Sequence, residues 1–226
     1  MTILFDMDGT LFAGDSQLRF ARWVLRRHGW RRLYLLPVLP GLVLCGLKLL
    51  SLERMKRLFL IYAWGMRREV LEAECRAFVE QELLPAVYEP VLARLRAHQA
   101  AGHTTILCSA SPDWWAPLVG QALGFERTIS TPVPTGRRVP LMPAIPAPGN
   151  NRAAAKLTRL AAVGITHAHT GYTDSTADLP MLSICRHAVL VNPAAKLCRQ
   201  APQGAEIIRT PQPNRLRFVL SCLLGW

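Results

Sequence analysis

The N-terminus carries a short apolar run that ends in two closely spaced carboxylates. Residues 2–5 are compatible with a buried strand, and Asp6 and Asp8 follow it directly, with Gly9 next. Alternate residues of a strand share one face, so both carboxylates can turn toward one point as the strand ends. A glycine lets the backbone approach that point closely. Oxygen ligands of this kind suit a divalent cation. The pattern therefore predicts metal-assisted chemistry on a phosphate.

The rest of the chain alternates between strand-like and helical patterns. Further strands are expected at 104–108, 128–131, 167–170, 188–191 and 205–208. One helix is expected after the caps Asp15 and Ser16, and another after the cap Ser51. Further helices are expected over 69–84, over 90–102, from the turn at 109–113 to about 123, and over 152–163. A turn is expected at 109–113, and six prolines predict an irregular stretch at 132–149. Such alternation is typical of a parallel sheet covered by helices, with ligands bound beyond the carboxyl ends of its strands.

The positive charge is concentrated in one part of the chain. Residues 19–68 hold twelve Lys or Arg and one acid, Glu53, so they account for eleven of the twelve net positive charges. A basic segment of this kind favours an anionic partner, which could be nucleic acid, anionic lipid or a phosphorylated substrate. The alternative is a basic face that is merely solvated.

An apolar stretch, Leu33–Leu50, lies inside this basic segment. Its eighteen residues raise the question of a membrane span. One crossing would place Asp6 and Asp174 on opposite sides of the bilayer, so a simple span is not expected. Pro37 and Pro40 instead predict a broken helix or a helical hairpin.

The residues around this stretch suggest where it would lie. Arg and Lys flank it on both sides, which suits an element that dips into the interface of an anionic membrane. The alternative is an apolar core within a soluble enzyme. The stretch 214–226 is also basic and apolar and is a candidate second contact.

The six cysteines form no CxxC pair and no paired spacing, which predicts reduced thiols in a cytosolic protein. Asp6 leaves no room for a signal peptide before the first strand, so none is expected.

Four polar clusters follow strands or begin helices in the predicted order. They are Asp6/Asp8, Ser109, Lys156 (or Arg152), and the Gly171-to-Asp178 segment GYTDSTAD. Together they resemble the haloacid dehalogenase superfamily, whose pattern is DxDGT, a Ser or Thr, a Lys, and GDSxxD. The resemblance implies an α/β fold: a Rossmann-like parallel sheet core over 1–13 and 89–226, with a helical C1-type cap inserted at 14–88.

The resemblance also implies roles for individual residues. Asp6 would attack phosphorus and form an aspartyl-phosphate, and Asp8 would act as general acid and then general base. Mg²⁺ would be held by Asp6, the Asp8 carbonyl and Asp174, with Asp178 either a further ligand or an orienting group. The residues expected to contact the phosphate or the rest of the substrate are Ser109, Gly9, Thr10, Ala110, Asp15 and Arg152. Asp15 is alternatively a plain helix cap.

The active-site cation has two candidates. Lys156 begins the sequence Lys-Leu-Thr-Arg-Leu, which matches the family's helix, but residues 153–155 are alanines where the family usually has a glycine. Arg152 lies nearer the expected start of the helix. Lys156 is the favoured candidate.

Shorter matches resemble one branch, the bacterial phosphatidylglycerophosphatase C family, within the phosphoserine phosphatase-like subfamily IB. They are Leu35-Leu-Pro-Val-Leu-Pro40, Ala63-Trp-Gly65, Ser109-Ala-Ser-Pro112 and Gly171-Tyr-Thr-Asp-Ser175. This branch implies a lipid phosphate substrate on the cytoplasmic side of the inner membrane, with the enzyme peripheral or monotopic. A soluble cytoplasmic enzyme is the alternative.

Two other functions stay open at this point. One is the same chemistry on a small soluble metabolite of the phosphoserine kind. The other is a membrane- or nucleic-acid-binding protein with a vestigial site, which the retained acidic and serine residues of all the motifs disfavour. Nucleic acid is not expected, because the basic residues flank an apolar run and not exposed aromatics.

Overall fold

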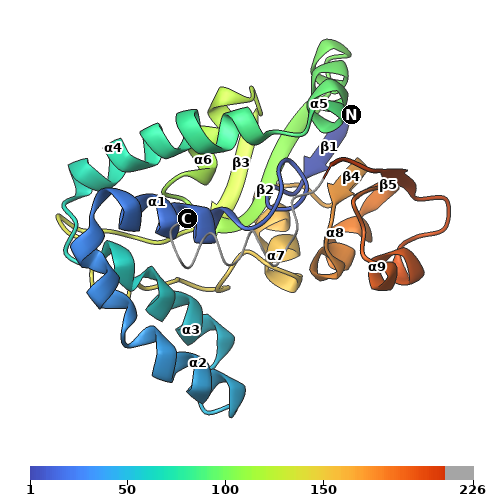
Figure 1. The fold of residues 1–226 in the computed structure, drawn as a ribbon. Helices are drawn as coiled ribbons and strands as arrows, with labels where there is room; N and C mark the ends of the chain where they lie inside the picture. The colour runs from blue at the N-terminus through green and yellow to red at the C-terminus, as the bar shows by residue number, and fades with distance from the viewer. Residues whose placement is uncertain (212–226) are drawn as a thin grey trace.

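A computed structural model describes residues 1–211 of the chain and contains one sheet of six parallel strands. The strands are β1 (Thr2–Phe5), β2 (Thr104–Pro112), β3 (Arg127–Thr131), β4 (Ala168–Thr173), β5 (Cys185–Val191) and β6 (Glu206–Ile208). Their spatial order is β3-β2-β1-β4-β5-β6 (Figure 1). This order confirms the predicted α/β fold, since β1 at the centre is the point where the winding reverses.

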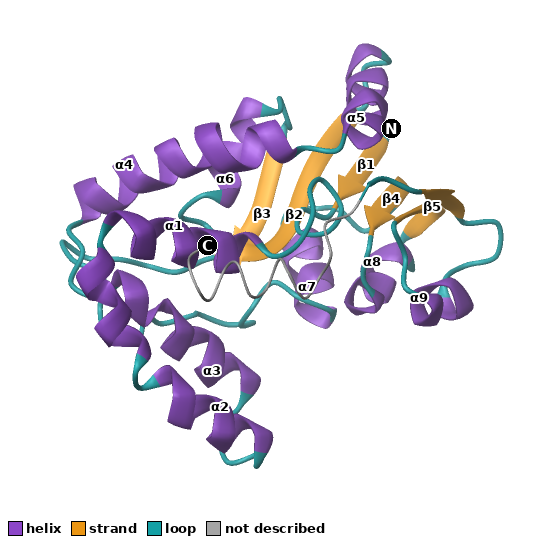
Figure 2. Cartoon of the chain, viewed as in Figure 1, coloured by secondary structure: helices purple, strands orange, loops and turns teal. Residues whose placement is uncertain are grey.

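Helices cover both faces of the sheet (Figure 2). On one face, Ile3 and Phe5 belong to a large apolar cluster with residues of α5 (Glu89–Ala100) and α6 (Ala116–Ala122). On the other, Leu4 packs with α7 (Ala154–Ala162) and α8 (Leu179–Leu182). The alternation along β1 follows from the two-residue period of a strand. α9 (Ala195–Gln200) follows β5.

The segment between β1 and α5 is helical. It contains α1 (Ser16–Arg27), a 3₁₀ helix (Gly29–Leu35), α2 (Val38–Gly46), α3 (Leu52–Phe59) and α4 (Arg68–Phe78). Asp15 caps α1 by accepting from the amides of Gln17 and Leu18, and Ser51 caps α3. Phe20 of α1 lies 4.8 Å from Trp115 between ring centroids, so the segment shares the apolar cluster of the sheet. The division of the chain at 13/14 and 88/89 stays a prediction.

The apolar stretch Leu33–Leu50 is broken at Pro37, as predicted, but α2 runs through Pro40 to Gly46 and forms a hairpin with α3, which begins only after the stretch. Pro37 precedes α2, and α2 and α3 pack together around a small cluster of their own, Val38, Met55 and Ile61. The pair projects away from the sheet (Figure 1). Within residues 1–211, no helix combines the length and the apolar composition that a membrane crossing requires.

Three local predictions were wrong. β2 does not end at residue 108 but continues to Pro112, because Pro112 pairs with Thr131 of β3 after a register shift. The helix expected over 69–84 ends as an α-helix at Phe78 and continues as a π turn and a 3₁₀ turn. The short helices α8 and α9 were not predicted, since four and six residues are too few to display a helical period. The stretch 214–226 lies outside the described residues.

Candidate active site

The polar motifs converge at the carboxyl ends of the central strands. Asp6 and Asp8 follow β1, Ser109 lies on β2, and Asp174 follows β4. The amide of Asp6 donates to the Tyr172 carbonyl at 2.9 Å, which continues the β1–β4 pairing up to the first carboxylate. The parallel topology therefore assembles residues that are up to 168 positions apart in the chain.

Lys156 is the cation that reaches Asp6. Its Nζ lies 2.6 Å from Asp6 Oδ1 and 2.7 Å from Asp178 Oδ1, and its side chain is 1% exposed. Thr173 Oγ1 donates to the other Asp178 oxygen at 2.8 Å, so both oxygens of Asp178 are engaged. Arg152, the other candidate, is exposed. Asp178 thus holds Lys156 against Asp6.

The charges of this trio are strongly coupled. Burial raises the pKa of Asp6 to about 6, against the opposing effect of the Lys156 charge. Burial alone would lower the pKa of Lys156, but the charges of Asp6 and Asp178 outweigh it and raise that pKa above its usual value. At neutral pH Asp6 is therefore an ionised carboxylate beside a protonated lysine.

Asp8 is held by a chain of hydroxyl groups. The Ser16 amide donates to Asp8 Oδ1 at 2.7 Å, and the Ser111 hydroxyl donates to Asp8 Oδ2. Ser16 Oγ lies 2.8 Å from Ser111 Oγ and accepts from Trp115 Nε1 at 3.0 Å. The single proton of the Ser111 hydroxyl points at Asp8, so in the Ser16–Ser111 contact Ser16 is the donor and Ser111 the acceptor. The chain orients the Asp8 carboxylate from both α1 and β2.

We expect Ser111→Ala to lower turnover of a phosphomonoester by about tenfold, because it leaves one oxygen of a buried carboxylate without its donor. Ser111→Thr keeps the hydroxyl and should recover most of the rate. Initial rates of phosphate release at saturating substrate measure both. Equal rates in Ser111→Ala and the unchanged protein would contradict a positioning role.

Gly9 and Asp174 are in close contact. Gly9 has φ of +81°, and a Cβ added there would lie 2.1 Å from Asp174 Oδ2, so any other residue would strain the backbone and displace the Asp174 carboxylate. Burial raises the pKa of Asp174 to about 8, and the charges of Asp6, Asp178 and Asp8 add to the effect. Burial likewise raises the pKa of Asp8 to about 7. The site thus holds more carboxylates than cations.

This excess of negative charge fits a hard divalent cation. Within the described residues, no three His, Cys, Asp or Glu side chains converge as a ready ligand set. Two carboxylates with a main-chain carbonyl, as expected for Asp6, Asp174 and the Asp8 carbonyl, need no such set. The donors are all oxygen atoms, which suits Mg²⁺ and not a soft metal.

The helix that carries Lys156 begins at a strained residue. Ala153, the residue before α7, has φ of +52° and ψ of −126°, a conformation that glycine adopts readily and alanine does not. Ala153 is the first of the three alanines that stand where the sequence resemblance leads us to expect a glycine. Lys156 lies one turn later, so the strain is located at the start of the element that positions the cation.

We expect Ala153→Gly to stabilise the protein by about 1 kcal/mol, because relief of strain exceeds the extra flexibility of glycine in the unfolded chain. The thermal midpoint should rise by about 2–4 °C. Ala155→Gly is the matched control, since Ala155 lies within the helix, and it should lower stability by about 1 kcal/mol. A lower midpoint for Ala153→Gly would contradict the strain.

A second lysine enters the site from α3. Lys56 Nζ donates to the Ala110 carbonyl and to Asn150 Oδ1, each at 2.6 Å. Thr131 Oγ1 lies 2.8 Å from both of these acceptors and has one proton to share between them. Burial lowers the pKa of Lys56 to about 8, and the charges of Asp15 and Asp8 oppose the shift. Lys56 therefore stands within electrostatic reach of Asp8.

The remaining predicted contacts are placed as follows. Ser109 is fully buried, and its Oγ accepts from the Ser111 amide at 3.0 Å. Thr10 Oγ1 lies 3.3 Å from Asp6 Oδ2. Asp15 is exposed and its side chain caps α1. Arg152 is also exposed, and its charge adds to the effect of burial in lowering the pKa of Lys56.

Sequence reasoning missed Ser16, Ser111, Trp115 and Lys56. Ser111 had a signal, since it follows a buried strand just as Ser109 does. Lys56 had none, because it belongs to a helix whose position over the site depends on the tertiary fold.

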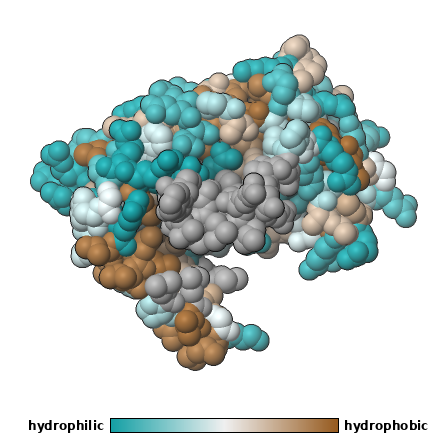
Figure 3. Space-filling model, viewed as in Figure 1, coloured by the Kyte–Doolittle hydropathy of each residue, from teal (hydrophilic) through white to brown (hydrophobic). Residues whose placement is uncertain are grey.

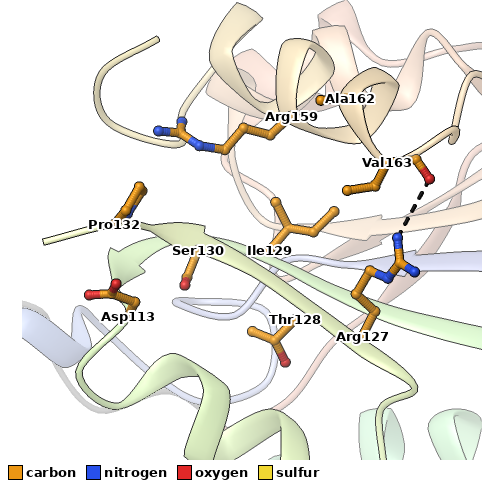
Figure 4. Close-up of a pocket in the computed structure, with 9 residues that line it drawn as sticks. All are labelled: Asp113, Arg127, Thr128, Ile129, Ser130, Pro132, Arg159, Ala162 and Val163. Carbon is orange, nitrogen blue, oxygen red and sulfur yellow. Dashed lines mark hydrogen bonds between the residues drawn. The ribbon is translucent and has the colours of Figure 1, made fainter. Parts of the chain in front are cut away.

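An open cavity of about 400 Å³ lies elsewhere, beside β3 and α7 (Figure 4). Its polar lining includes Asp113, Arg127 and Arg159. Arg127 donates to the Val163 carbonyl and Arg159 to that of Gly149, and none of the carboxylates described above lines it. This cavity is not the catalytic centre.

Comparison with known proteins agrees with this geometry. Residues 3–183 match the haloacid dehalogenase-like hydrolase family. The chain belongs to this family. The chain is also 27% identical over 209 residues to phosphoserine phosphatase SerB1 of Mycobacterium tuberculosis, across 85% of its own length and 65% of that protein. It therefore spans just under two thirds of that relative's length.

Two solved structures share the fold. A protein of unknown function from Bordetella pertussis has a TM-score of 0.76 at 21% identity, covering 92% of this chain and 97% of that one. A substrate-bound phosphoserine phosphatase complex has a TM-score of 0.61 at 14% identity, covering 97% and 96%. Both likenesses place the hydrolase in the same α/β fold.

Proposed function

We propose that this hydrolase is a Mg²⁺-dependent phosphatase that cleaves phosphomonoesters through an aspartyl-phosphate on Asp6. The observation that carries the proposal is the buried Asp6 carboxylate, 2.6 Å from Lys156 and adjacent to a second carboxylate, Asp8, at the carboxyl end of β1. A phosphate monoester repels nucleophiles by its own charge, so a nucleophile flanked by cations is what its cleavage requires.

The residues divide the reaction between them. Asp6 attacks phosphorus, and Lys156 neutralises charge on the transferred group while Asp178 keeps it in place. Asp8, with a pKa raised to about 7, donates a proton to the leaving alkoxide and then accepts one from the hydrolytic water. Ser109 and the amide of Ala110 are the proposed phosphate contacts at the end of β2.

Mg²⁺ would be held by Asp6, Asp174 and the Asp8 carbonyl, and it would supply charge neutralisation of the phosphate oxygens. Asp178 is proposed to position Lys156, because its two oxygens already have partners.

The metal-free protein should become less stable as pH rises. The folded-state pKa values of Asp8 and Asp174 lie at about 7 and 8, above the ordinary 3.8, so the folded state binds more protons than the unfolded state. Their contribution is complete at low pH and is lost as pH rises through those values. In EDTA, we expect unfolding free energy to fall by about 2–4 kcal/mol from pH 6 to pH 8.

Addition of Mg²⁺ should reverse this trend, raising the thermal midpoint more at pH 8 than at pH 6, because the ion neutralises the ionised carboxylates. Asp174→Asn should weaken both the pH dependence of the unfolding free energy in EDTA and the pH dependence of the Mg²⁺ effect on the thermal midpoint. A Mg²⁺ effect of equal size at the two pH values, or in Asp174→Asn, would contradict the metal assignment.

For the substrate, we propose a lipid phosphate such as phosphatidylglycerophosphate, hydrolysed at the cytoplasmic face of the inner membrane. Support comes from the basic and apolar composition of the inserted segment and from Lys56, a second cation whose Nζ donates to the Ala110 carbonyl beside the proposed phosphate contacts. A leaving group with its own negative charge, such as a phosphodiester, suits that cation. The name of the SerB1 relative favours a second candidate, a small phosphoserine-like compound.

One assay separates the two candidates. Phosphate release is measured from phosphatidylglycerophosphate in mixed micelles and from a panel of soluble phosphomonoesters that includes phosphoserine. We expect the lipid to have the higher kcat/KM and Lys56→Ala to lose that preference. A higher kcat/KM for phosphoserine would overturn the lipid assignment but leave the phosphatase mechanism standing.

A further inference from the structure

The α2–α3 hairpin exposes an unusual number of large apolar side chains. Eight of the thirteen exposed large apolar residues in the described part of the chain lie from Trp30 to Trp64, and four of them, Val43, Leu44, Leu47 and Leu49, belong to the hairpin itself. At the hairpin tip, residues 43–50, Val43 is 62% exposed, Leu47 63% and Leu49 71%. Figure 3 shows the corresponding brown surface where the hairpin projects from the body of the molecule. Contiguous exposed apolar surface on a protein marks a site of contact.

Basic side chains accompany this surface. Arg26, Arg32, Lys48 and Arg54 are exposed, and none of them forms an ion pair with another residue of the described chain. Lys48 lies between the exposed Leu47 and Leu49 at the turn itself. Exposed apolar side chains with unpaired cations among them are complementary to a membrane leaflet, whose headgroups are anionic and whose acyl chains are apolar.

We infer that the hairpin tip docks on an anionic lipid bilayer, with its leucines in the interface and its cations at the headgroups. A second copy of the chain is the weaker occupant, because pairing the tips would bring two strongly basic segments together. The inference deepens the proposed function, because docking would serve the hydrolysis of a lipid phosphate and in that sense rests on it. The exposure of the leucines and the charge of the hairpin do not depend on the reaction.

Docking in this way would bring lipid to the active site. Lys56 lies on α3, which begins directly after the tip, and four residues of helix separate it from Leu52, or about 6 Å along the axis. Its Nζ contacts the Ala110 carbonyl beside the proposed phosphate site. A tip that enters the interface by about 5–10 Å would therefore hold Lys56 near the headgroup plane.

The hairpin is also built as a distinct unit. The buried residues of its apolar cluster differ from those of the sheet, although Leu35 and Phe59 pack against both clusters. Its described polar links to the core include Lys56 and Arg57, which donates to the Pro143 carbonyl at 2.8 Å. The exposed leucines take no part in either apolar cluster. Substitution of these leucines should therefore spare the fold and the site.

The test is sedimentation of the full chain with vesicles of phosphatidylcholine, alone or mixed with phosphatidylglycerol. We expect binding to the mixed vesicles, with Leu47→Ser/Leu49→Ser lowering the partition coefficient by about tenfold or more. Lys48→Glu/Arg54→Glu should abolish the preference for anionic vesicles. Val163→Ser/Ile207→Ser, which alters exposed apolar residues far from the hairpin, is the matched control and should bind normally. Thermal midpoints confirm that each variant is folded.

The outcomes separate docking from catalysis. Failure of the unchanged protein to bind anionic vesicles, or equal binding by Leu47→Ser/Leu49→Ser, overturns the docking inference. Self-association that requires Leu47 and Leu49, without vesicle binding, also overturns it in favour of a second copy. Vesicle binding by a protein that hydrolyses no phosphomonoester would leave docking intact and refute the proposed function. Asp6→Asn should bind vesicles as well as the unchanged protein does.

Discussion

Asp6→Asn is expected to lower phosphate release by at least about 10⁴-fold, because an amide cannot form the aspartyl-phosphate. The substitution keeps the size of the side chain and removes its negative charge. Phosphate release from a soluble phosphomonoester under saturating Mg²⁺ measures the loss. A single-turnover experiment with a phosphomonoester labelled in its phosphoryl group should detect acid-stable label on the unchanged protein and none on Asp6→Asn.

The matched control is Asp113→Asn. Asp113 is an exposed carboxyl, and its Oδ1 accepts from the Val133 amide at 3.0 Å, a bond that asparagine can keep. Asp113 touches none of the residues at the end of β1, so the activity of Asp113→Asn should stay within about twofold of that of the unchanged protein. Comparable activity in Asp6→Asn and the unchanged protein would refute a covalent mechanism on Asp6.

Lys156→Met should remove both activity and stability. The variant would leave Asp6 and Asp178 as buried carboxylates without their shared cation, at a cost of about 3–5 kcal/mol. Turnover should fall by about 10³-fold, since charge on the transferred phosphate is no longer neutralised. Denaturant unfolding and initial rates measure the two effects.

Arg152→Met is the matched comparison, because sequence alone left Arg152 as the alternative cation. Its side chain is exposed, so its removal should change the unfolding free energy by no more than about 0.5 kcal/mol. Turnover should change far less than in Lys156→Met. The reverse ranking of the two variants would refute the assignment of Lys156. A paired variant, Lys156→Met/Asp178→Asn, should recover part of the lost stability but not the activity.

Much of the fold could be predicted from local patterns. The alternation of apolar strand runs with helical segments was enough to predict a parallel sheet. Pro37 was enough to predict the break before α2, whereas Pro40 lies in the first turn of that helix and does not break it. The end of β2 was missed, because Ser109 to Pro112 read locally as a turn. Its extended form depends on the pairing of Pro112 with Thr131, a contact made only when β3 is in place.

The site was partly predictable for a related reason. Asp6, Asp8, Ser109 and Asp174 all follow or end strands, and in a parallel sheet such positions lie at one edge. The partners of Asp8 were not predictable in this way. Ser111 and Trp115 meet Ser16 through contacts between segments about a hundred residues apart. The roles of all these residues stay predictions until the variants are measured.

By itself, the sequence determined the class of sheet, the carboxylates at the strand ends and the separation of basic and apolar residues in one segment. These features follow from residue type and period within short windows. Only the tertiary structure decided that Lys156 and not Arg152 meets Asp6, that hydroxyls hold Asp8, and that leucines of the hairpin stay exposed. Each of these depends on packing between distant segments, where the free energy of burying or pairing a side chain is settled by its neighbours in space.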